Sequence, residues 1–223
     1  MSKRDSLRNI VSNDRDWSGL TAALDLGTNK VACLIAKLDS SRDSNGVKRP
    51  RIVGFGHRMS DGLRAGAIID IERVEMIVRS TVEAAEKEAG TNIENVIVNL
   101  GSSNIESKLI AFDVSVSGHR VSDQDLKRVF HPNTLSGSHV EGEELVHSIP
   151  IGYSIDGNRG IRDPRGMFGE KLGVNMHTIS TKKGFVRNLE SVITRCHLGI
   201  EKIVVSPFAS ALACLVEDEK EVG

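Results

Sequence analysis

A short polar stretch near the start of the chain carries the residue types that can hold phosphate. It reads Asp25-Leu26-Gly27-Thr28-Asn29-Lys30 and lies between two apolar runs. A glycine in such a turn can take backbone conformations closed to other residues, and its missing side chain lets a ligand approach the backbone amides. A hydrated magnesium ion that bridges two phosphates requires a carboxylate, which Asp25 provides, and Lys30 adds a cation at the rim. The stretch therefore predicts a site for phosphate and magnesium.

The same six residues also fit a plain β-hairpin. In that interpretation Asp25 accepts hydrogen bonds from amides of the turn, and an isolated D-x-G-T pattern is more often of this kind. The rest of the chain has to decide between the two interpretations.

The composition is that of a folded domain protein. The chain has 223 residues, 39% hydrophobic and 26% charged, which is enough for one large domain or two small ones. A net charge of -1, from 29 basic and 30 acidic residues, gives no bulk electrostatic case for a nucleic-acid or membrane-surface partner. No apolar stretch approaches the roughly 20 residues of a membrane helix, and the polar residues 1–16 contain no signal-peptide core, so a cytoplasmic location is expected.

Cysteine and histidine usage indicates no metal site. Cys33, Cys196 and Cys214 lie far apart in apolar patterns, which predicts buried thiols. The seven histidines form no cluster with ligand spacing.

The elements that must position the turn begin with strands at 21–26 and 31–38. A solvated loop is expected at 39–50, a third strand at 51–59, a helix ended by Gly90 and a fourth strand at 93–100. The helix is predicted from apolar residues at helical spacing, namely Ile71, Val74, Val78, Val82, Ala85 and Ala89.

The pattern changes from Gly101 onward. Strands are expected at 107–117, 144–155 and 172–180, with a short helix capped by Ser122 and Asp125 after the first and a turn at 156–169 before the last. A helix from Phe185 to Cys196, ended at Gly199, and a buried strand at 200–205 then follow.

The last expected element is a helix with Ser206 as its cap and Pro207 at its first position. Its apolar residues are Ala211, Leu212 and Leu215. Three phenylalanines are expected in the core, namely Phe130, Phe185 and Phe208.

With 101–181 set aside as an insertion, the remaining order is three strands, a helix and a strand, then helix, strand and helix. This order predicts an α/β protein with the ribonuclease H-like fold, carrying an inserted α+β subdomain of strand, helix, strand and strand. The expected parts are a polar tail at 1–17, a discontinuous first lobe at 18–100 and 182–223, and the inserted subdomain at 101–181.

Four ordered motifs make a resemblance specific. They are the turn itself within 24–31, G-L-R-A-G-A-I-I-D at 62–70, the I-R-D-P-R-G-M turn at 161–167 with Gly169 and Leu172, and Val205-Ser206-Pro207. Between about Leu20 and Glu217 the chain resembles the N-terminal half of the bacterial cell-division FtsA family. That family lies in the superfamily of actin, the heat-shock chaperone ATPases and the sugar kinases, whose first lobe is actin-like.

The resemblance implies an ATP-binding, actin-like adaptor that polymerises and tethers FtsZ to the cytoplasmic face of the inner membrane at the septum. Asp25 would hold magnesium through water, and the amides of Gly27, Thr28 and Asn29 would face the β- and γ-phosphates. Lys30 would contact phosphate or the surface of the hairpin itself. The subdomain at 101–181 would serve contacts between protomers and with other division proteins. No catalytic residue is expected, and at most a weak ATPase in the full-length protein.

The sequence departs from the family by stopping at Gly223, before a second glycine-rich phosphate motif. The FtsZ-tail site and the membrane-binding C-terminal helix are expected to be missing from this chain as well. It is then either a fragment or a truncated gene product.

Two other function classes share single motifs with this chain. A sugar or acetate kinase of the same superfamily would share the first motif, but a phosphotransferase needs a catalytic aspartate on a second loop, and no such motif is present. The G-x-x-G at 166–169 could suggest an RNA-binding KH loop, but that loop joins two helices, whereas strand-like patterns flank it here. Walker-type phosphate binding is excluded because no G-x-x-x-x-G-K-S/T occurs.

Half a nucleotide cleft leaves bound phosphate exposed to water, where screening weakens each charge contact. We therefore expect this chain to bind ATP weakly or undetectably in a calorimetric titration. Sub-micromolar binding would contradict this expectation.

Overall fold

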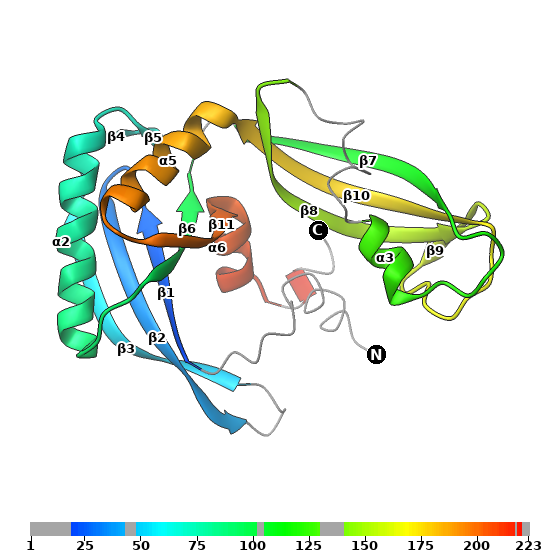
Figure 1. Ribbon diagram of the computed structural model, residues 1–223, viewed down its shortest axis with the longest axis horizontal. Coiled ribbons are helices and arrows are strands. Elements are labelled where there is room, and N and C mark those ends of the chain that lie inside the picture. The colour runs from blue at the N-terminus through cyan, green and yellow to red at the C-terminus, as the bar shows by residue number, and fades with distance from the viewer. Residues whose placement is uncertain (1–18, 43–47, 102–104, 130–140, 217, 220–223) are drawn as a thin grey trace. The chain divides into compact units, whose positions relative to one another are not determined.

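The computed structural model describes residues 19–42, 48–101, 105–129, 141–216 and 218–219, so the expected tail at 1–17 lies outside the described part. The chain divides into two compact units (Figure 1). Unit 1 consists of Met1–Ser103 and Gly184–Gly223, and unit 2 consists of Asn104–Lys183.

Unit 1 is built on a five-stranded sheet of order β11-β6-β1-β2-β3. Its strands are β1 (Leu20–Leu26), β2 (Lys30–Arg42), β3 (Lys48–Met59), β6 (Asn95–Leu100) and β11 (Gly199–Val205). The first three pair antiparallel, whereas β6 is parallel to both β1 and β11. All five predicted strands are confirmed, but the predicted loop at 39–50 is largely wrong, because β2 and β3 continue to pair as far as Arg42 and Lys48.

Helix α2 (Ile71–Ala89) follows the prediction closely. The side chain of Asp70 caps it by accepting a hydrogen bond from the Arg73 amide, and Gly90 ends it in a left-handed conformation, with φ of 68°. The apolar stripe is buried, as the spacing predicts, at Val74, Val78, Val82 and Ala85. In Figure 1 this helix runs alongside β2 and β3.

Two glycines of β3 let α2 come this close. A Cβ on Gly54 would collide with the carbonyl oxygen of Ala85, and a Cβ on Gly56 would collide with that of Thr81. Helix α5 (Lys183–Arg195) contacts α2 at the C-terminal end of α5. There, the Arg79 side chain of α2 donates a hydrogen bond to the Arg195 carbonyl at 3.1 Å. Together α2 and α5 supply apolar side chains to the core of unit 1.

Helix α6 (Ser206–Cys214) differs from its prediction. Val205 rather than Ser206 is the N-cap, and no side chain caps the helix, so Ser206 is its first residue. None of its residues is buried: Leu212 is 46% exposed, and Leu215 just beyond the helix is 40% exposed. The apolar face predicted for this helix is therefore not part of the core of unit 1.

Other local predictions also need correction. Helix α5 stops at Arg195 and His197 takes the left-handed conformation, with φ of 60°, so Gly199 begins β11 instead of ending the helix. Cys33 is buried but Cys196 is only half-buried and Cys214 is exposed. Two phenylalanines expected in the core, Phe185 and Phe208, are half-buried, and Phe130 lies outside the described residues.

The motif at 62–70 contains a small hairpin that the sequence did not predict. Strands β4 (Leu63–Arg64) and β5 (Ala67–Ile68) pair across a two-residue turn. Ala65 and Gly66 both have positive φ, 47° and 75°, as a type I′ turn requires.

Unit 2 is an antiparallel four-stranded sheet of order β7-β10-β8-β9. Its strands are β7 (Ile105–Ser115), β8 (Glu143–Ile155), β9 (Asn158–Ile161) and β10 (Lys171–Lys182), with α3 (Asp123–Val129) between β7 and β8. The predicted order of strand, helix, strand and strand is present, and β9 is an additional short strand inside the predicted turn.

One face of this sheet forms the core of unit 2. Leu126 and Val129 of α3 belong to the same buried cluster as Leu172, Val174 and Met176 of β10. Unit 2 therefore has a hydrophobic core of its own.

We expect Gly56→Ala to destabilise unit 1 by about 1–3 kcal/mol, because a methyl group there forces α2 away from β3. The matched control is Gly184→Ala in α5, where a Cβ meets nothing within 4 Å, and it should change the free energy of unfolding by no more than about 1 kcal/mol, in the stabilising direction. Urea denaturation followed by circular dichroism measures both. Equal stability of the two variants would contradict the packing of α2 on β3.

Candidate functional site

The turn between β1 and β2 is held closed by its own backbone. The strands pair as far as Leu26 and Val31, and the Gly27 amide donates to the Lys30 carbonyl at 3.0 Å. Gly27 does not have a positive φ, contrary to the expectation, and the glycine is required by space instead. A Cβ at this position would lie 2.8 Å from the Lys30 carbonyl oxygen.

The turn leaves two amides available for a ligand. The Gly27 amide is used within the turn, whereas those of Thr28 and Asn29 have no protein partner in the part of the chain that the structure describes. Both residues are exposed. Of the three amides expected to face phosphate, Thr28 and Asn29 are the two that can donate to a ligand without breaking the turn.

A second loop supports the turn from the side. The Ser60 amide donates to the Asn29 carbonyl at 3.0 Å, and the Gly66 amide donates to the Thr28 hydroxyl at 3.2 Å. This loop contains the β4-β5 hairpin, so two of the motifs identified in the sequence meet in space.

The negative charge of one carboxylate in this loop, that of Asp61, is already offset by an arginine. The Asp61 side chain accepts from the Arg73 guanidinium at 2.6 Å, and this hydrogen bond, followed by the guanidinium charge, lowers the pKa of Asp61. Asp70 is also within 3.2 Å of Arg73. These two acidic groups are therefore poor candidates for a metal ligand.

Asp25 has a different partner, which the sequence did not indicate. Asn99, in β6, donates from Nδ2 to Asp25 Oδ1 at 2.5 Å and to Ser206 Oγ at 3.0 Å. Its Oδ1 accepts from the Leu26 amide at 2.6 Å. These contacts join the ends of β1 and β6 to the first residue of α6.

The sheet topology puts this junction where ligands usually bind. In the sheet, β2 lies on one side of β1 and β6 lies on the other side, and β11 is the edge strand beyond β6. Ligands of open α/β sheets bind outside the carboxyl ends of strands at such a reversal of strand order. Asp25, Asn99 and Ser206 all lie at these carboxyl ends.

The side chains at the junction suit phosphate and magnesium. Asp25 is exposed, and its Oδ2 has no partner among the described residues, so one carboxylate oxygen can receive a water of a hydrated ion. Lys30 is exposed on the same face of the sheet, because Asp25 pairs with Ala32 and side chains alternate along β2. An anionic oxygen, two amide donors and an ammonium group are the groups that a magnesium-bound polyphosphate requires.

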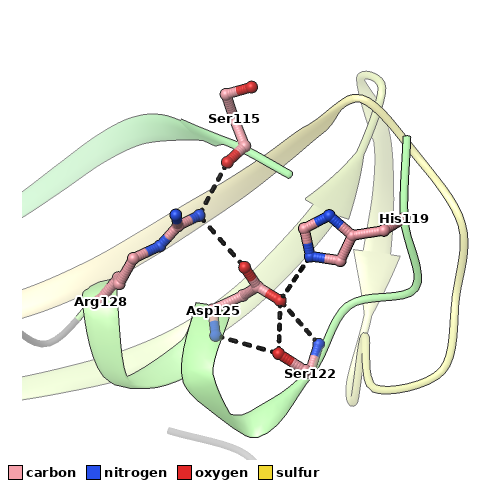
Figure 2. Close-up of polar contacts among 5 residues, drawn as sticks. All are labelled: Ser115, His119, Ser122, Asp125 and Arg128. Atoms are coloured by element: carbon pink, nitrogen blue, oxygen red, sulfur yellow. Dashed lines mark hydrogen bonds and ion pairs between the residues drawn. The ribbon is translucent and has the colours of Figure 1, made fainter. Parts of the chain in front are cut away.

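Unit 2 contains a second polar cluster, centred on a buried carboxylate (Figure 2). Asp125 is only 4% exposed and its Oδ2 accepts from the Ser122 amide at 2.9 Å and the Ser122 hydroxyl at 2.6 Å. His119 Nε2 lies 3.1 Å from the same oxygen, and Arg128 donates to Oδ1 at 3.1 Å. The predicted cap of the short helix by Ser122 and Asp125 is confirmed.

These contacts make the cluster structural rather than catalytic. The Ser122 hydroxyl is the main cause that lowers the pKa of Asp125 to about 2; burial acts in the opposite direction, and the Ser122 amide and His119 lower it further. Ser122 and His119 both contact the carboxylate and no hydrogen bond joins them in Figure 2, so the serine lacks the adjacent base that a nucleophile needs.

The turn at 161–169 is also structural. Arg165 donates to Asp123 of α3 at 2.7 Å and to Asp163 at 3.0 Å, and the Gly166 amide donates to the Val121 carbonyl at 2.9 Å. Its G-x-x-G lies between strands β9 and β10. The KH interpretation fails because that loop must join two helices.

The described residues contain no group of three or more histidine, cysteine, aspartate or glutamate side chains that could hold a metal ion. Nor is any helix among them long and apolar enough to cross a membrane.

Comparison with known proteins gives a consistent assignment. The protein-family model described as "SHS2 domain inserted in FTSA" matches residues 102–180. The chain is 38% identical over 210 residues to the cell division protein FtsA of Rhizobium meliloti and 36% identical over 210 residues to that of Agrobacterium fabrum. Each alignment covers 92% of this chain and 47% of the relative, so the chain spans about half the length of the curated relatives it matches.

The chain is an FtsA-like protein. A solved structure, the PilM-PilN type IV pilus biogenesis complex, overlays with a TM-score of 0.56 at 13% identity and covers 86% of this chain and 49% of that one. At this identity the overlay bears on the fold alone. The FtsA-like chain has the actin-like first lobe that its sequence predicted, with an SHS2 subdomain inserted in it.

Asp125 generates a prediction about pH. A carboxylate with a lowered pKa contributes stability that is complete above its ordinary value of 3.8 and is lost as the pH falls through that value toward 2. We expect Asp125→Asn to lower the unfolding midpoint at neutral pH and to make it depend less on pH between about 5 and 2. Thermal unfolding followed by circular dichroism measures both effects.

The matched control is Asp123→Asn, which changes an exposed carboxylate two residues away on the same helix. It should have the smaller effect at neutral pH. If the two variants unfold alike at every pH, the Asp125 cluster does not stabilise unit 2.

Proposed function

We propose that the FtsA-like chain is the nucleotide-binding first half of a cell-division adaptor. The observation that carries the proposal is the exposed Asp25 carboxylate, with one oxygen unpartnered among the described residues, beside the unpartnered amides of Thr28 and Asn29. The ligand proposed for these groups is ATP with Mg²⁺. The names of the relatives, cell division protein FtsA, support the cellular role.

Each residue of the turn has its own part in this proposal. Asp25 would hold a water of the hydrated magnesium ion, Thr28 and Asn29 would donate amide protons to phosphate oxygens, and Lys30 would offset phosphate charge. Gly27 would act indirectly, because only a residue without a Cβ lets the turn close beneath the ligand. When bound, the magnesium ion neutralises phosphate charge. The chain's residues supply binding and orientation, and no catalytic group is assigned.

The partners belong to the proposal as well. Tethering of FtsZ, self-association and a place at the cytoplasmic face of the membrane are proposed for a protein of the relatives' full length. Contacts with further division proteins are proposed for unit 2. Apolar side chains exposed on that unit support this assignment: Leu109 is 73%, Ile151 57% and Phe168 64% exposed.

The test uses this chain, labelled with nitrogen-15, and amide chemical shifts recorded with millimolar ATP in the presence and absence of Mg²⁺. Chemical shifts detect weak as well as tight binding, so the experiment covers the low affinity expected for this chain. We expect the chemical shifts of the Thr28 and Asn29 amides to change when nucleotide is added and to change further when Mg²⁺ is added. Asp25→Asn should remove the magnesium-dependent part.

The control is Asp113→Asn in β7 of unit 2, which should leave the response unchanged. No response of the turn amides at millimolar nucleotide, or a magnesium effect that survives Asp25→Asn, would contradict the proposed site.

A further inference from the structure

Asn99 makes three hydrogen bonds with its one side-chain amide. It accepts from a backbone amide that can only donate, that of Leu26 at 2.6 Å. This contact fixes which end of the side chain is the oxygen, so the NH₂ group necessarily points to Asp25 and Ser206. The side chain of Asn99 therefore has one orientation that satisfies all of its partners.

The bond to Leu26 replaces a contact between strands. The parallel pairing of β1 with β6 ends at Leu24 and Val98, and the Asn99 side chain takes the amide of Leu26 just beyond it. In this way the strands stay connected at their carboxyl ends, next to the turn of Gly27.

The bond to Asp25 divides the two carboxylate oxygens into different roles. Oδ1 accepts from Asn99 at 2.5 Å, whereas Oδ2 has no partner among the described residues. A neutral amide donor leaves the negative charge of the carboxylate intact, which a lysine or arginine partner would offset. Asp61 and Asp70, which both form ion pairs with Arg73, show the alternative in which a positive side chain offsets the carboxylate charge.

We propose that Asn99 is a positioning residue of the nucleotide site. It orients Asp25 so that Oδ2 alone is presented to a hydrated magnesium ion, and it fixes this orientation against the first residue of α6 through Ser206. This inference rests on the proposed function of the turn. It adds to the site a residue 74 positions away in sequence from Asp25.

The test is Asn99→Asp, an isosteric change. The new carboxylate still accepts from the Leu26 amide, but it cannot donate to Asp25 or Ser206 and it repels Asp25. In the nitrogen-15 experiment with ATP and Mg²⁺, we expect the apparent magnesium affinity to fall on the order of tenfold or more, as the loss of a hydrogen bond to a charged group predicts. Nucleotide-induced shifts without Mg²⁺ should remain.

The matched control is Asn95→Asp, the same change four residues earlier on the same face of β6. It should leave the magnesium response unchanged. An unchanged response in Asn99→Asp, with the response lost in Asp25→Asn, would overturn the role of Asn99 while leaving the proposed function standing. A response that survives Asp25→Asn would overturn the proposed function as well.

A second measurement follows the side chain of Asn99 itself. In the unsubstituted chain, the side-chain NH₂ signals of Asn99 should shift when Mg²⁺ joins ATP, while those of Asn95 should not. They should also shift in Asp25→Asn without ligand. If the Asn99 signals respond neither to Mg²⁺ with ATP nor to Asp25→Asn, the proposal is contradicted.

Discussion

The hydrogen bonds of the Asn99 side chain are the constraint on which the arrangement of the site depends. They connect the carboxyl ends of β1 and β6 to the first residue of α6, three segments widely separated in sequence. Because the parallel pairing of β1 with β6 has already ended at Leu24 and Val98, this side chain holds the ends of the two strands together beside the turn. The position of Asp25 thus follows from contacts of β6 as well as from its own hairpin.

Three glycines also help to fix the structure around the site, because a side chain at these positions would collide with the backbone of a neighbouring segment. Gly27 closes the turn because a Cβ would contact the Lys30 carbonyl, and Gly54 and Gly56 bring α2 against β3 because their Cβ atoms would collide with its backbone. Gly27 thus determines the shape of the turn at the site, and Gly54 and Gly56 allow α2 to pack on the sheet that contains the site. Unit 2 depends instead on a buried carboxylate, Asp125, whose cap and ion pairs fix the start of α3 on a separate core.

The sequence predicted the elements that depend on local patterns. Helix α2 follows from its apolar spacing and from Gly90 at its end, and the turn with Asp25 follows from residue types. Asn99 was missed because its contacts lie 73 to 107 positions away, and only a polar residue near the end of an apolar strand hinted at them. The core position predicted for Phe208 of α6 was also wrong, because an apolar pattern shows which face is apolar but not whether anything in the chain covers it.

The account's central claim is that magnesium and phosphate bind at the carboxyl ends of β1 and β6. Manganese can replace magnesium at oxygen ligands, and its unpaired electrons broaden the signals of nearby nuclei. With Mn²⁺ and ATP, the account predicts broadening centred on the amides of Leu26, Thr28 and Asn29, and weaker broadening at Leu20 and Asn95, which lie at the amino ends of β1 and β6. Broadening centred anywhere else on the chain, or spread evenly over it, would contradict the account.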